Sequence, residues 1–172
     1  MFENQTIIDY VTSATGDVFS TMLGLEMEWK ASHLEEADLS VDDGVLAFVG
    51  MAGPWTGAGA VTCSARFACK ICAQLLGTDA DSVNEEVLDA LGEVTNMIIG
   101  GFKTLIEQHT GVLGLSIPTV VYGHNFTSRS TGRIEWVVVP FQCGDETMEV
   151  RVCLSPSKDH TSHRTHPAVA VA

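Results

Sequence analysis

Residues 82–109 read SVNEEVLDALGEVTNMIIGGFKTLIEQH, and this stretch decides the fold. It opens with a capping-box pattern, Ser82 at the cap and Glu85 three residues later, which predicts the start of a helix. At 100° per residue, one face of that helix is apolar and carries Leu88, Leu91, Thr95, Ile98, Phe102 and Leu105. The pattern therefore predicts one long helix, ending near His109, whose apolar face packs on a core.

The opposite face of this predicted helix is polar and carries Asp89, Glu93, Asn96, Gly100, Lys103 and Glu107. A polar face is ordinary for an amphipathic helix, but Asn96 is a poor helix former and stands in the interior. Gly100 and Gly101 follow one turn later, each at a cost of about 0.5–1 kcal/mol relative to Ala. Two explanations remain open: another molecule docks closely here, or a second element of the same domain crosses closely.

The rest of the chain predicts two shorter helices and six strands around the long helix. The helices span 4–22, capped by Asn4, and 64–77, capped by Ser64, and Gly24 and Gly77 end them. Alternating or β-rich segments predict strands at 25–31, 45–51, 59–63, 116–122, 134–141 and 147–154, with a turn at 53–57. We expect one α+β domain over 1–155, an antiparallel sheet with helices packed on it, and a flexible tail over 156–172.

The composition limits the partners and the compartment. The formal net charge is −13, from 22 acidic and 9 basic residues. Such a chain repels nucleic acid and anionic membranes on average, so a protein with a basic surface is the expected partner. The first residues lack the pattern of a secretory signal, and no apolar run is long enough to span a bilayer. We expect a cytoplasmic protein.

Five cysteines and a histidine-containing tail raise the question of a metal or redox site. Cys69 and Cys72 form a CxxC, but Cys72 also falls on the apolar stripe of its predicted helix, and no second CxxC completes a zinc site. Core packing is the favoured interpretation, because free cysteines are among the most buried residues. His160, His163 and His166 recur in the tail without a carboxylate cage, which favours adventitious metal binding. We expect no metal site, and a small metal protein remains the weakest of three hypotheses.

The run DALGEVTNMIIGGFK, from Asp89 to Lys103, resembles the signature helix of the CheC, CheX and FliY chemotaxis phosphatases. That signature has Asp or Ser, then Glu four residues on, then Asn three residues on, and a Pro about one strand later. Pro118 stands in the corresponding region of this chain. The CheC and FliY relatives carry the signature helix twice, whereas this chain has one clear copy and so resembles the CheX branch. That resemblance implies a homodimer joined through its sheet.

The resemblance implies an enzyme that hydrolyses the aspartyl phosphate of a CheY-type response regulator. By position, the resemblance implies Asn96 and Glu93 as the catalytic residues: Asn96 would orient the attacking water, and Glu93 would contact a lysine of the regulator and help to fix the docking. Asp89 and Gly100 are expected at the partner-binding face together with Glu93. Whether Asp89 takes part in binding or has only a structural role stays open. The resemblance also implies that the chain needs no cofactor of its own, because the regulator would supply Mg²⁺. The alternative is a non-catalytic module of the same fold that binds a regulator or another signalling protein.

Overall fold

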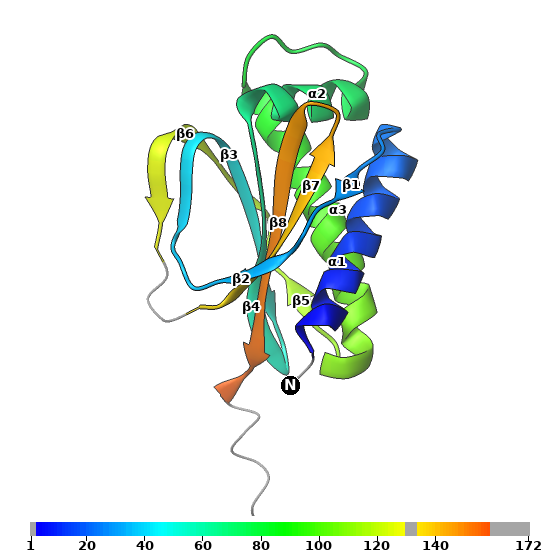
Figure 1. The fold of residues 1–172 in the computed structure, drawn as a ribbon, viewed down its shortest axis with the longest axis vertical. Helices are drawn as coiled ribbons and strands as arrows, with labels where there is room; N and C mark the ends of the chain where they lie inside the picture. Colours follow the sequence, from blue (N-terminus) through cyan, green and yellow to red (C-terminus); the bar gives the residue numbers. More distant parts are fainter. Residues whose placement is uncertain (1–2, 130–133, 159–172) are drawn as a thin grey trace, which may run out of the picture.

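The computed structural model describes residues 3–129 and 134–158, and Figure 1 shows an antiparallel sheet with helices packed on one face. This confirms the predicted α+β class. The strands are β1 Glu28–Trp29, β2 His33–Glu35, β3 Leu39–Ala52, β4 Trp55–Cys63, β5 Gly114–Leu115, β6 Thr119–Ser128, β7 Trp136–Cys143 and β8 Glu146–Pro156.

The sheet is built around four long antiparallel pairings, β6 with β3, β3 with β4, β4 with β8, and β8 with β7. Two-residue β5 also pairs with the end of β3, and the short β1 and β2 both pair with β7. Only three residues separate β2 from β3, although these strands belong to opposite ends of the strand order. The sheet therefore curls, and β6 and the first half of β3 bend away from the helices (Figure 1).

The bounds of several predicted strands need correction, two of them by several residues. The segment 25–31 forms a strand only at Glu28 and Trp29, and both residues are exposed. Strand β3 begins at Leu39, six residues before the predicted start at Val45. Asp42, Asp43 and Gly44 are residue types depleted from strands, and they are tolerated here because β6 pairs with this part of β3. Pairing between distant segments overrides the local propensity at these positions.

The first two helices follow the predicted pattern at their C-terminal ends. Helix α1 spans Asn4–Val18 and continues as a π-helical turn, η1 Phe19–Leu23, which ends at Gly24 with φ of 62°. Helix α2 spans Ala65–Leu76, with Ser64 as its cap and Gly77, at φ of 71°, as its end. The prediction of Asn4 as a cap is wrong, because Glu3 occupies that position and makes no side-chain capping bond.

Helix α3 spans Glu85–Thr110, so the predicted long helix is confirmed. Its cap is Asn84 rather than the predicted Ser82: the Asn84 Oδ1 accepts a hydrogen bond of 3.0 Å from the backbone N–H of Val87. Asn and Ser are about equally good caps, so the capping-box pattern alone does not distinguish them. No helix in the described part of the chain is long and apolar enough to cross a membrane.

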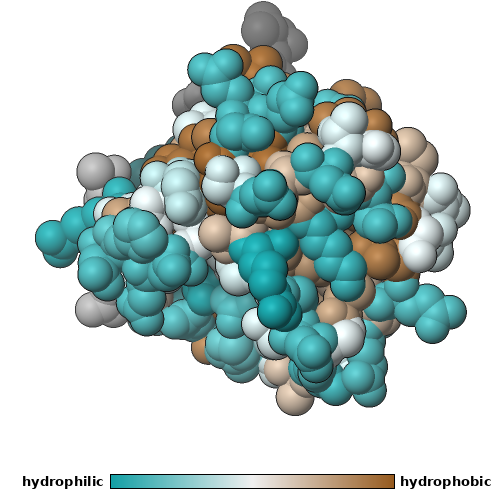
Figure 2. All heavy atoms as spheres, turned by 90° about the horizontal axis from the view of Figure 1, so that it is seen from above, coloured by the Kyte–Doolittle hydropathy of each residue, from teal (hydrophilic) through white to brown (hydrophobic). Residues whose placement is uncertain are grey.

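Apolar side chains pack on both faces of the curled sheet. The larger core lies between the sheet and the helices, and its fully buried members include Phe19, Phe67, Leu91, Ile98, Phe102 and Val150. The smaller cluster, on the other face, is built from Leu39, Val41, Leu46, Ala60, Trp136, Val138 and Cys153. Seen from the α2 end, hydrophilic side chains predominate at the surface, with some apolar ones between them (Figure 2). Helix α3 is held by the larger core, which leaves one strip of it for other contacts.

Candidate active site on helix α3

The exposed strip of α3 is narrower than the sequence predicts. Leu91, Thr95, Ile98 and Phe102 are buried as expected, whereas Leu88 and Leu105 are only half-buried. Further side chains outside the predicted stripe are also buried, namely Val87, Ala90, Val94, Ile99 and Ile106. The helix packs against α1, α2 and the sheet, so most of its circumference is covered. The signature residues lie in what remains: Asp89 and Glu93 are exposed and Asn96 is half-buried.

A groove of about 490 Å³ lies beside the two carboxylates, between α3 and the start of β6. Its lining consists of Leu88, Asp89, Gly92, Glu93, Pro118 and Val120. Gly92 makes the close approach of the two elements possible, since a Cβ there would stand 3.1 Å from Val120 Cγ2 and 3.7 Å from Pro118 Cβ. The structure therefore brings Pro118 to the signature helix. Sequence reasoning missed the contribution of Gly92, although it stands between Asp89 and Glu93 in the signature.

The segment 114–120 runs antiparallel to α3 along this strip. Leu115 lies beside Gly100, where its Cδ1 is 3.9 Å from the position a Cβ would take, and Pro118 lies beside Gly92. Asn96 is midway between Gly100 and Gly92 on the helix, about 6 Å along the axis from each at a rise of 1.5 Å per residue. The residues between Leu115 and Pro118 therefore pass Asn96 at its own level on the helix.

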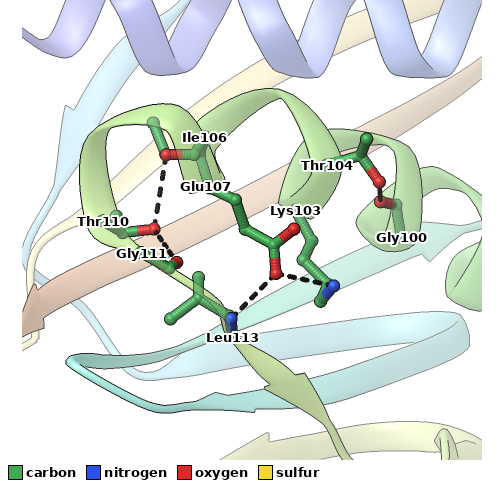
Figure 3. Close-up of polar contacts among 8 residues, drawn as sticks. All are labelled: Gly100, Lys103, Thr104, Ile106, Glu107, Thr110, Gly111 and Leu113. Carbon is green, nitrogen blue, oxygen red and sulfur yellow. Dashed lines mark hydrogen bonds and ion pairs between the residues drawn. The ribbon is translucent and has the colours of Figure 1, made fainter.

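A network at the C-terminal end of α3 fixes the turn from which this segment starts (Figure 3). The Glu107 carboxylate pairs with Lys103 Nζ at 2.7 Å and accepts a hydrogen bond of 2.8 Å from the backbone N–H of Leu113. The hydrogen bond from Lys103, and then that from Leu113, hold the pKa of Glu107 below its usual range. Gly111 reverses the chain at φ of 77°. Lys103 and Glu107, on the predicted polar face, thus serve the fold of the segment rather than an open surface.

Ser116 ties the middle of the segment to the sheet. Its Oγ accepts a hydrogen bond of 2.9 Å from the backbone N–H of Gly50, and its own N–H donates to the carbonyl oxygen of Gly50 at 2.9 Å. The same hydroxyl donates to the carbonyl oxygen of Ile117 at 2.9 Å. The segment is therefore held at both ends and in the middle, which keeps Pro118 against α3.

The three signature side chains have no hydrogen-bond or ion-pair partner among residues 3–129 and 134–158. Asp89 and Glu93 are one helical turn apart, so their Cβ atoms stand about 5–6 Å from each other. Asn96 follows Glu93 on the same strip. The two exposed carboxylates thus line the groove, whereas the half-buried Asn96 lies one turn further along the strip and is not among the residues that line it.

The two adjacent glycines of α3 have different surroundings. A Cβ at Gly101 would stand 3.1 Å from Ala14 Cβ, so Gly101 allows α1 to cross α3 closely. A Cβ at Gly100 would have Leu115 Cδ1, at 3.9 Å, as its nearest neighbour outside the helix backbone. Gly100 is half-buried on the signature strip. The close crossing that the sequence left open therefore explains Gly101, whereas a docking role for Gly100 stays a prediction.

The cysteines do not form a metal centre in the described residues, where no group of three or more potential ligands occurs. All five are free, and Cys72 is buried in the core as its helical position predicts. Burial raises the pKa of Cys63 to about 12, and the nearby Glu146 carboxylate adds to this. Such a thiol stays protonated and unreactive at neutral pH. His160, His163 and His166 lie outside the described residues.

Comparison with known proteins places this geometry in a family. The model of the family described as chemotaxis phosphatase CheX matches residues 45–142. No curated protein sequence matches the chain. The solved structure of a chemotactic CheC-like protein from Shewanella oneidensis is 30% identical, with a TM-score of 0.74, over 89% of this chain and 100% of that one.

Two further solved structures are similar over most of their length. The chemotaxis protein CheX from Desulfovibrio desulfuricans is 27% identical, with a TM-score of 0.77, over 87% of this chain and 99% of that one. A chain in the CheX–CheY–BeF3–Mg complex from Borrelia burgdorferi is 25% identical, with a TM-score of 0.70, over 86% of this chain and 97% of that one. The family match covers more than half of the chain, and this chain therefore belongs to the CheX family of chemotaxis phosphatases.

Proposed function

We propose that this chain dephosphorylates the aspartyl phosphate of a CheY-type response regulator. The observation that carries the proposal is the pairing, on one strip of α3, of the exposed Glu93, which lines a groove with Pro118, and the half-buried Asn96 one turn further on, both without partners in the described fold. Membership of a phosphatase family supports it. So does the relative from Borrelia burgdorferi, whose structure contains CheY with BeF3 and Mg.

Asn96 is the catalytic residue in this proposal. An amide does not act as a general base near neutral pH, but it donates and accepts hydrogen bonds and can hold a water molecule in line with a phosphorus atom. Phosphoryl transfer depends mainly on positioning and on electrostatic stabilisation of the transferred group. The Asn96 side chain enters the regulator's site as the two proteins dock and orients the attacking water there. Its half-buried position on a rigid helix limits the conformational freedom that it loses.

Glu93 and Asp89 form the electrostatic part of the docking surface. Two carboxylates at i and i+4 repel each other by a few tenths of a kcal/mol. A lysine of the regulator relieves this repulsion when it pairs with Glu93, and the pairing fixes the orientation in which Asn96 enters. Asp89 stands one turn further from Asn96, so it contributes to the attraction and not to the chemistry. Gly100 leaves the helix surface bare on the other side of Asn96.

The Mg²⁺ ion comes with the regulator in this proposal. The Borrelia complex contains Mg together with CheX and CheY, and an aspartyl phosphate paired with Mg²⁺ has part of its negative charge neutralised before the phosphatase arrives. The chain then supplies positioning only and needs no cofactor of its own.

A homodimer joined through the sheet belongs to the same proposal. Strand β6 pairs with β3 along one edge, and no described strand pairs with its other edge. Free backbone donors and acceptors at such an edge favour pairing with a second chain. Sedimentation of the purified protein at several concentrations measures the oligomeric state directly, and a monomer throughout would rule the dimer out.

The test is the decay of each phosphorylated CheY-type regulator of the same organism, with and without the protein. We expect faster decay for at least one regulator, and loss of binding when Glu93→Lys reverses the charge that meets the regulator's lysine. Glu36→Lys makes the same charge change at an exposed residue outside the strip and serves as the control. If a regulator binds but its decay is unchanged, the chain is a non-catalytic binding module.

A further inference from the structure

The most exposed large apolar side chain of the described residues lies next to the candidate active site. Ile117 is 85% exposed and immediately precedes Pro118, which lines the groove. The segment runs antiparallel to α3 with Leu115 beside Gly100 and Pro118 beside Gly92, so Ile117 passes at about the level of Asn96. An apolar side chain and the proposed catalytic amide thus share one surface.

The backbone of Ile117 is held in place from both sides. Its carbonyl oxygen accepts a hydrogen bond of 2.9 Å from Ser116 Oγ, and Ser116 is itself bonded to Gly50 of β3. A residue before proline is restricted to extended backbone conformations, and Pro118 packs over Gly92. An exposed side chain on a fixed backbone loses little conformational freedom when a partner covers it, which is the property of a preorganised binding contact.

The charges around Ile117 identify the kind of partner. A two-fold contact with a second copy of this chain would set the same patch against itself, and Asp89 and Glu93 would then face their own copies. Two acidic pairs brought together repel, in a chain whose formal net charge is already −13. A partner with a basic group beside an apolar surface satisfies both parts of the patch. In the proposed function the regulator supplies that basic group, as the lysine that pairs with Glu93.

We propose that Ile117 is an apolar docking contact for the receiver domain of the response regulator, and that it contributes to the choice among regulators. The proposal rests on the proposed function and adds a residue outside the signature helix. Glu93 and Asp89 attract any receiver with a basic active site, whereas the fit around Ile117 depends on the apolar residues of one particular receiver. Specificity follows from this difference in affinity.

The experiment compares three variants in the decay assay, over a range of phosphoregulator concentrations. Ile117→Ser should raise the half-saturating concentration about tenfold, since it removes most of the apolar area of the contact, and should leave the rate at saturation unchanged. Ile117→Leu keeps the apolar area and should stay near wild type. Val112→Ser is the matched control: Val112 is 79% exposed and lies just before the segment 114–120, beyond the C-terminal end of α3 and about 20 Å along the helix axis from Asn96.

Binding of the regulator's BeF3–Mg form gives a readout that does not depend on hydrolysis. The proposal predicts a weaker dissociation constant for Ile117→Ser and an unchanged one for Val112→Ser. Equal behaviour of these two variants would overturn it, and so would a loss of activity that sedimentation traces to dissociation of a homodimer. Failure of the proposed function looks different, because the wild-type protein then accelerates the decay of no regulator.

Discussion

Gly92 of α3 lies directly against Val120 of β6: a Cβ at Gly92 would stand 3.1 Å from the Cγ2 of Val120. This contact sets the width of the groove that runs between Asp89, Glu93 and Pro118. It also links the signature helix to the strand that follows Pro118. The glycine therefore has a geometric reason to stand in the middle of a helix, despite the cost of about 0.5–1 kcal/mol.

We expect Gly92→Val to push the start of β6 away from α3. The added side chain overpacks the interface, so urea unfolding should show a loss of about 1–3 kcal/mol. Regulator dephosphorylation should fall as well, because Pro118 moves away from the signature residues. Gly16→Ala is the control: no atom lies within 4 Å of a Cβ at Gly16 in α1, so this variant should gain rather than lose stability. Full activity and stability in Gly92→Val would contradict the assigned role of the contact.

Gly100 and Gly101 should respond in opposite ways to added side chains. Gly101→Leu drives a side chain into Ala14 of α1 and should destabilise the fold by about 1–3 kcal/mol. Gly100→Ala has room and should stabilise it by about 0.5–1 kcal/mol. If the regulator packs on the bare helix at Gly100, the stabilised variant should nevertheless need more phosphoregulator for half-saturation. Urea unfolding and the decay assay measure the two effects separately, and an unchanged half-saturating concentration would remove Gly100 from the docking surface.

The interactions of Glu107 make a pH-dependent contribution to stability. Its pKa is lowered in the folded state by Lys103 and the N–H of Leu113. The contribution is therefore present at pH values above the unfolded-state pKa and is lost as the pH falls through the folded-state pKa. Glu107→Gln should be less stable than wild type at neutral pH, and the difference should shrink in acid. Urea unfolding across this range tests the sign, and a difference that is constant with pH would contradict the account.

The polarity pattern of one segment was enough to predict the long helix and its exposed residues. Asp89, Glu93 and Asn96 emerge on one strip because helical periodicity is a local property of the chain. The residues that complete the site arrive through long-range packing. Neither the approach of Pro118 to Gly92 nor the fixation of Ile117 by Ser116 and Gly50 has a local signature. They depend on strand pairing between distant segments.

The errors in the predicted fold have the same origin. The start of β3 at Leu39 is stabilised by pairing with β6, about 80 residues later in the chain, and its own Asp42 and Asp43 argue locally against a strand. The alternation at 25–31 predicts a longer strand than β1. Strand β1 is short because β7 pairs with only two of those residues. The helical pattern predicts Lys103 and Glu107 on an open polar face. They form instead an internal network with Leu113, a partner that becomes visible only once the chain reverses at Gly111.

The central claim is that the Asn96 amide orients the attacking water, and Asn96→Ala tests it most directly. Loss of one polar catalytic contact of this kind costs about 10²-fold in rate, or ~2.7 kcal/mol. The measurement is the decay rate of the phosphorylated regulator at a saturating concentration, for wild type and variant, with binding of the BeF3–Mg form as the control. We predict a rate about 10²-fold lower and nearly unchanged binding. A variant that turns over close to the wild-type rate would contradict the account.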